Sequence, residues 1–135
     1  MGSMSELNAS KTDAIHDKLV KKAGETIFRK FKVVMNIMGN NVASIDDVYP
    51  DLIAYDVYSV KPFLASETPT LICEVEVGAE ITDELVAKWL QLNSLDVDRI
   101  VLILPENTRS GAEDALKKLG PKFELRFFDK DLRIR

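Results

Sequence analysis

Apolar residues recur along this chain with two different periods, and each period predicts one type of secondary structure. Apolar residues three and four positions apart predict helices, whereas short apolar or alternating runs rich in valine and isoleucine predict strands. The expected elements, in chain order, are a helix at 10–30, strands at 31–38, 51–58 and 70–77, a helix opening after Thr82, a strand at 99–104, a helix at 110–119 and a strand at 122–128. Ser10 or Thr12 could cap the first helix, and Gly120 with Pro121 ends the last one. A turn at 39–41 closes the first strand, and a loop at 61–69 leads to the third.

The connections between these elements predict how the strands pair. Short loops join the first three strands, which favours antiparallel neighbours, and a helix between the third and fourth strands favours a parallel crossover. The chain is therefore expected to be an α/β protein in the order α-β-β-β-α-β-α-β, with a mixed β-sheet flanked by helices.

The length and the ends of the chain indicate one domain. A chain of 135 residues can bury one real core but not two independent ones. Residues 1–4, Met-Gly-Ser-Met, are interpreted as an expression-vector remnant, which leaves 5–135 as a single domain. No apolar stretch approaches the roughly 20 residues of a membrane span, and no leader pattern opens the chain. We therefore expect a cytoplasmic protein with no membrane partner.

Acidic residues interrupt the apolar run of the third strand. Side chains two positions apart in a strand share a face, so Glu74 and Glu76 face one way and Cys73 and Val75 the other. One reading is a solvated outer face, in which only Ile72 would be misplaced. The other is a recessed pair of carboxylates, which repel each other and lose hydration unless a hard cation such as Mg²⁺ compensates them.

Charge is distributed unevenly along the chain. The net charge is −4, which argues against a dedicated nucleic-acid binder. Residues 42–98 contain twelve acidic residues and two lysines, whereas residues 11–32 and 99–135 each carry an excess of basic residues. This layout suits a phosphate-backbone ligand that meets a metal-filled acidic pocket, and it also suits an ordinary soluble surface.

The sequence resembles the PD-(D/E)XK nuclease superfamily, which has the restriction-endonuclease-like fold. The resemblance rests on the element order, on Pro50-Asp51 opening the second strand and on Glu74-Val75-Glu76 in the third, and it spans roughly residues 13–128. Similar uncharacterised microbial members have an acid-x-acid pair, a helix with a tryptophan, here Trp89, and a strand that ends in proline.

The resemblance implies roles for individual residues. Asp51 matches the first metal ligand and Glu74 the second, and Val75 would offer its backbone carbonyl to the same Mg²⁺ or Mn²⁺ ion. Glu76 stands where the family usually has lysine, as it does in some restriction enzymes, so it would bind a second cation or orient the attacking water. The structural alternatives are an Asx turn at Asp51 and a surface position for Glu76.

Three further residues have both a functional and a structural interpretation. Glu25 lies on the first helix, where many family members place an additional acidic ligand, but neighbouring basic residues favour a solvated ion-pair cluster. Lys88 would replace the missing lysine from the next helix, or pair with Glu84 four residues earlier. His16, the only histidine, is interpreted as a partly buried boundary residue.

Two functions of different classes follow from these patterns. The first is a Mg²⁺-dependent nuclease that hydrolyses DNA phosphodiester bonds with metal-activated water. It is expected to be a homodimer or to receive an arm from another chain, and Phe127, Phe128 and Ile134 would contribute apolar surface to that contact. The second is a nuclease-like fold that has lost catalysis and serves as a binding or assembly module. The absence of the usual lysine and the negative net charge favour the second.

Overall fold

A computed structural model describes residues 4–37, 43–56, 69–78 and 80–135 of the protein. The elements are α1 (Met4–Glu25), β1 (Phe31–Met35), β2 (Leu52–Asp56), β3 (Leu71–Val75), α2 (Asp83–Gln91), β4 (Arg99–Pro105), α3 (Arg109–Leu119) and β5 (Phe123–Phe128), with 3-10 turns η1 (Leu92–Ser94) and η2 (Glu106–Thr108). The expected mixed α/β class is therefore confirmed.

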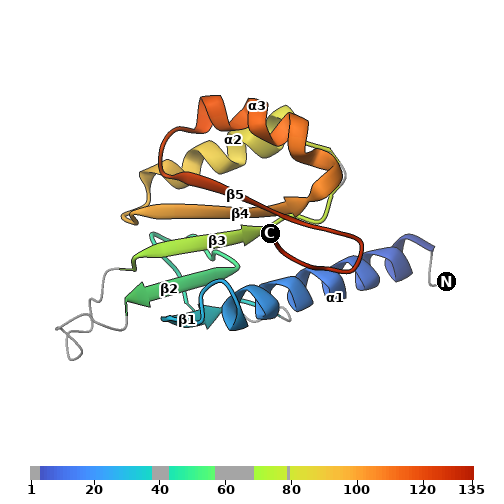
Figure 1. Ribbon diagram of the computed structural model, residues 1–135, viewed down its shortest axis with the longest axis horizontal. Coiled ribbons are helices and arrows are strands. Elements are labelled where there is room, and N and C mark those ends of the chain that lie inside the picture. Colours follow the sequence, from blue (N-terminus) through green and yellow to red (C-terminus); the bar gives the residue numbers. More distant parts are fainter. Residues whose placement is uncertain (1–3, 38–42, 57–68, 79) are drawn as a thin grey trace.

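One five-stranded sheet in the order β1-β2-β3-β4-β5 forms the centre of the molecule (Figure 1). β1 pairs with β2 and β2 with β3 in antiparallel fashion, whereas β3 with β4 and β4 with β5 are parallel. The pairing expected from the loop lengths is thus confirmed. The helices α2 and α3 cover one face of the sheet and α1 covers the other (Figure 1).

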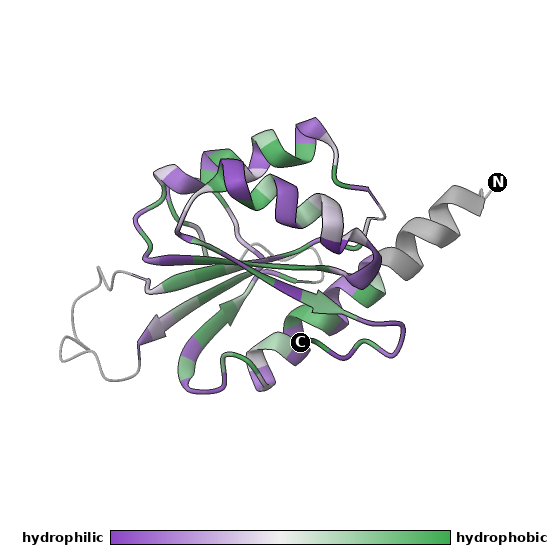
Figure 2. Ribbon diagram, turned by 45° about the horizontal axis from the view of Figure 1, so that its top comes forward, coloured by the Kyte–Doolittle hydropathy of each residue, from purple (hydrophilic) through white to green (hydrophobic). Residues whose placement is uncertain are grey.

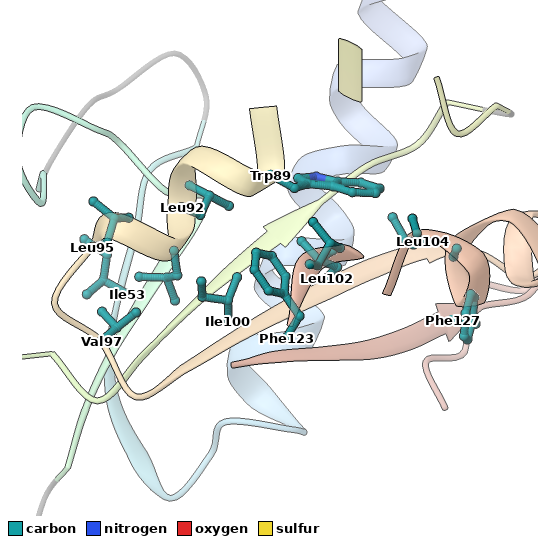
Figure 3. Packing of buried hydrophobic residues seen from close by; sticks show 14 residues of the cluster. Ile53, Trp89, Leu92, Leu95, Val97, Ile100, Leu102, Leu104, Phe123 and Phe127 are labelled. Carbon is teal, nitrogen blue, oxygen red and sulfur yellow. The ribbon is translucent and has the colours of Figure 1, made fainter. Parts of the chain in front are cut away.

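Each face of the sheet has its own hydrophobic core. On the α2 and α3 side, Trp89 lies over Leu102 of the sheet, and Ile100 and Phe123 belong to the same cluster (Figure 3). On the α1 side, Leu19 and other apolar residues of the helix pack against the opposite face of the same strands. The strands are hydrophobic along most of their length, whereas the helices alternate between hydrophobic and hydrophilic residues (Figure 2). The sheet is therefore buried on both faces, which explains the almost continuous apolar run of β4.

The interpretation of the third strand changes accordingly. Leu71, Cys73 and Val75 belong to the core on the α1 side, as alternation predicts. Ile72 is also fully buried and belongs to the core under α2 and α3. Because Glu74 shares the face of Ile72, it lies on a covered face of the sheet and not on a solvated one.

Several expected boundaries differ from the structure. The first helix begins at Met4, before the expected cap at Ser10 or Thr12, and ends at Glu25. The expected turn at 39–41 and most of the loop at 61–69 lie outside the described residues. Of the residues expected to supply apolar surface to a dimer, Phe127 is buried. Phe128 and Ile134 pair through an isolated backbone bridge, and their side chains are partly buried against the core on the α1 side.

The helix ends follow local chemistry. Gly120, at the end of α3, has φ of 99°, a left-handed conformation that only glycine adopts without strain, and the following Pro121 prevents the helix from continuing. Within the described part of the chain, no helix has the length and apolar character needed to cross a bilayer.

Thr82 is the N-cap of α2, and its loss is expected to destabilise the protein by about 1 kcal/mol. The Thr82 hydroxyl oxygen accepts a hydrogen bond from the Leu85 backbone N–H at 3.2 Å. Urea denaturation of Thr82→Ala and of the control Thr82→Ser, which keeps the hydroxyl, measures this contribution. Equal midpoints for the two variants would show that the cap adds no stability.

Candidate functional site

Asp51 and Glu74 face each other at the edge of the sheet where β2 begins and β3 ends. Leu52 lies opposite Cys73 in the antiparallel register, so the next pair of residues outward is Asp51 with Glu74. Directly opposed residues of an antiparallel pair have Cβ atoms only about 5 Å apart. Two of the predicted site residues, 23 positions apart in sequence, are thus brought together by strand pairing.

The Asp51 carboxylate is held by partners from two other elements. Its Oδ2 atom accepts a hydrogen bond from the Val75 backbone N–H at 2.7 Å. The same oxygen lies 3.1 Å from Nε2 of His16 on α1. The other ring nitrogen of His16 lies 3.1 Å from Oδ1 of Asp17. Contacts to β3 and α1 therefore fix the orientation of Asp51, and no Asx turn is needed to explain its position.

The electrostatics of Glu74 differ strongly from those of a surface carboxylate. Burial, and then the negative charge of Asp51, raise the pKa of Glu74 from 4.5 to about 8, and the hydrogen bond between the two carboxyl groups acts in the same direction. The positive charge of Lys88 opposes this shift. At neutral pH and without an added cation, Glu74 therefore holds a proton.

His16 supplies positive charge on the other side of Asp51. The hydrogen bond to Asp51 raises the pKa of His16 from 6.5 to about 9, against the effect of partial burial, and the charges of Asp51 and Asp17 add to the increase. His16 is therefore an imidazolium at neutral pH. Sequence reasoning placed it only as a boundary residue. Its shared helical face with the buried Val20 and Ala23 was the available sign that it points toward the sheet.

Glu76 does not join the carboxyl pair. Its Oε1 atom accepts a hydrogen bond from the Gly78 backbone N–H at 3.2 Å, so the side chain bends back on its own segment. The Glu76 backbone N–H still donates to the Ile103 carbonyl at 3.0 Å and continues the pairing of β3 with β4. Glu76 is half-buried just beyond the end of β3, so its exposure is intermediate between that of a recessed site residue and that of a surface residue.

Lys88 and Glu25 lie on helices that cover opposite faces of the sheet, and only the charge of Lys88 acts on the pair of Asp51 and Glu74. Lys88 is exposed on α2, yet its charge acts on Glu74 across the space between helix and sheet. Among the described residues, no ion pair joins Lys88 to Glu84, the alternative partner. Glu25 is exposed at the last position of α1, about 13 Å along the helix axis from His16, and does not approach the pair.

The oxygen atoms at this edge of the sheet are possible ligands for a divalent cation. The N–H and C=O groups of one strand residue point the same way, so the Val75 carbonyl faces the Asp51 side, as its N–H does. The described residues contain no group of three or more His, Cys, Asp or Glu side chains placed to hold a metal ion. Two carboxylates, one carbonyl and bound waters nevertheless suit Mg²⁺, which keeps several waters in proteins. The unfavourable charge of the paired carboxyl groups is what such an ion would compensate.

Comparison with known proteins adds no family to this geometry, since no protein-family model, curated protein or solved structure matches the chain.

Proposed function

We propose that the protein is a Mg²⁺-dependent nuclease of the PD-(D/E)XK type, with a restriction-endonuclease-like core, that hydrolyses DNA phosphodiester bonds. The observation that carries the proposal is the direct opposition of Asp51 and Glu74 at the ends of β2 and β3, where burial and mutual repulsion raise the pKa of Glu74 to about 8. A carboxyl pair of this kind is costly to ionise unless a cation binds it, so it is more typical of a site than of a structural contact.

The residues around the pair have distinct roles in this proposal. Asp51 and Glu74, with the Val75 carbonyl, would hold the metal, and a bound Mg²⁺ would lower the pKa of water and offset negative charge on the phosphate. His16 and the Val75 N–H position Asp51 through its Oδ2 atom. Lys88 supplies the positive charge that the family obtains from lysine at the place of Glu76.

Isothermal titration calorimetry with Mg²⁺ and Mn²⁺ tests the metal site itself. The wild-type protein is expected to bind one ion with a measurable heat, and Asp51→Ala is expected to remove that heat. Asp56→Ala is a matched control, because Asp56 is an exposed aspartate at the opposite end of β2. Identical heats for the wild type and for Asp51→Ala would place any bound ion elsewhere and overturn the proposal.

A second candidate function is a binding or assembly module that has kept the fold without catalysis. The contacts of two site residues favour it. His16 already lies against the Asp51 oxygen and supplies positive charge there, and Glu76 is bonded to Gly78. In this case neither Mg²⁺ nor Mn²⁺ gives a heat of binding, and a plasmid-nicking assay gives the same trace activity for the wild type and for Glu74→Ala.

In this proposal the active form of the nuclease is a homodimer, because a second copy adds substrate-binding surface to a catalytic domain of this small size. Basic residues on both sides of the acidic region would then contact the phosphate backbone on either side of the cut.

A further inference from the structure

A cavity of about 630 Å³ opens where β4 and β5 end, and it is lined by residues 105–107 and 128–131. Pro105 lies opposite Phe128 in the register, so both strands stop at the same level. Val75 pairs with Ile103, and the cavity therefore begins two residues beyond the end of β3, on the same edge of the sheet as Asp51 and Glu74. Strand spacing and rise place it on the order of 10 Å from the carboxyl pair.

The cavity is lined by apolar surface and by the side-chain amide of Asn107, which can hydrogen-bond a ligand. Pro105 and the half-buried Phe128 supply the apolar surface. Asn107 is exposed, and within the described residues no hydrogen bond occupies its side chain. Asp129 is already engaged, because its Oδ1 atom accepts the backbone N–H groups of Asp131 at 2.9 Å and Arg133 at 3.0 Å. Apolar walls with few polar groups are typical of small-molecule sites.

The lining of the cavity is not positively charged. It carries three acidic residues, Glu106, Asp129 and Asp131, and one basic residue, Lys130. Arg133 and Arg135, which are outside the lining, partly offset two of the acidic side chains, with Arg133 at 3.8 Å from Asp131 and Arg135 at 4.0 Å from Asp129. The cavity therefore has little attraction for a phosphate group. It suits an uncharged planar group with a hydrogen-bonding edge.

We propose that this cavity receives an unpaired nucleobase of the nucleic-acid substrate, one or two nucleotides from the bond that is cut. The inference rests on the proposed nuclease and names its substrate class, a single strand or a duplex with an unpaired base. The base contacts Phe128 and Pro105 with its faces and Asn107 with its edge. A base in an intact duplex would have to leave the stack at a cost of a few kcal/mol, which disfavours fully paired DNA.

Chemical-shift mapping on the ¹⁵N-labelled protein tests the cavity directly. A single-stranded thymidine tetranucleotide, titrated without divalent metal, is expected to shift the amides of residues 106–107 and 128–131. Asn107→Ala is expected to weaken this binding about 5- to 10-fold, as for the loss of one or two hydrogen bonds. Gln91→Ala is the matched control, since Gln91 is an exposed amide on α2 outside the cavity.

A separate Mg²⁺ titration of the same sample distinguishes this inference from the proposed nuclease. Mg²⁺ shifts near residues 51 and 74–75 with no tetranucleotide shifts at the cavity would overturn the inference and leave the nuclease standing. Tetranucleotide shifts at the cavity without any Mg²⁺ effect would support the base site and overturn metal-dependent cleavage. Unchanged affinity in Asn107→Ala, or shifts spread over other surfaces, would also overturn the base site.

Discussion

Replacing Asp51 by asparagine is expected to reduce the proposed Mg²⁺-dependent DNA cleavage by roughly 10²- to 10³-fold, the usual loss when one group that stabilises developing charge is removed. The amide oxygen of asparagine can still accept the Val75 N–H, so the backbone contact at 2.7 Å is retained. The negative charge that would hold the cation and that pairs with His16 is lost. Initial rates of supercoiled-plasmid nicking, with circular dichroism as a check of folding, measure the effect.

The control for this prediction is Asp56→Asn. It makes the same chemical change at the other end of β2, where the residue is exposed and lies opposite Phe31. It is expected to cleave at the wild-type rate. If Asp51→Asn and Asp56→Asn nick equally fast, the nicking comes from a contaminant or from another site, and the roles proposed for Asp51 and Glu74 are wrong.

Much of the fold could be predicted because its local signals agree with each other. The alternating and continuous apolar runs gave the strands, Thr82 gave the start of α2, and Gly120 with Pro121 gave the end of α3. The start of α1 was wrong because capping residues also occur inside helices, where they form no cap. Thr12 and Ser10 have the right chemistry for a cap, but the helix continues through them.

The candidate site was predicted in part, and the missing part depends on tertiary packing. The opposition of Asp51 and Glu74 follows from strand register, which two short antiparallel strands with a common hydrophobic face determine. The contact of His16 with Asp51 depends on where α1 docks against the sheet, and no local signal specifies this. The bend of Glu76 toward Gly78 likewise occurs beyond the end of β3, where alternation no longer fixes side-chain direction.

The interactions around Asp51 and Glu74 connect the two faces of the sheet at one edge. His16 comes from α1, Asp51 and Glu74 come from the sheet, and Lys88 comes from α2. Basic and acidic groups therefore alternate across the layers. The cost of a second buried negative charge beside Asp51 is avoided only while Glu74 keeps its proton or a cation is bound. A metal ion and pH should consequently act on the stability of the protein through the same residues.

In the absence of divalent metal, the free energy of unfolding is expected to be largest near pH 5 and to fall by several kcal/mol by about pH 9. The folded protein holds the Glu74 proton up to about pH 8, whereas the unfolded chain loses it near 4.5. His16 similarly loses its proton near pH 9 when folded and near 6.5 when unfolded. In both windows the folded state binds more protons, so raising the pH favours unfolding.

Urea denaturation between pH 4 and pH 9 in EDTA, with Glu74→Gln and Glu124→Gln beside the wild type, separates the contributions. Glu74→Gln should remove the decline that begins above 4.5 and leave only the His16 part above 6.5. Partial burial opposes the shift at Glu124, but hydrogen bonds and charges of Arg99 and Arg126 lower its pKa, so Glu124→Gln should alter only the acidic limb. A wild-type profile that is flat from pH 5 to pH 9 would show that Glu74 ionises freely, and the carboxyl pair would then lack the electrostatic cost on which the metal site depends.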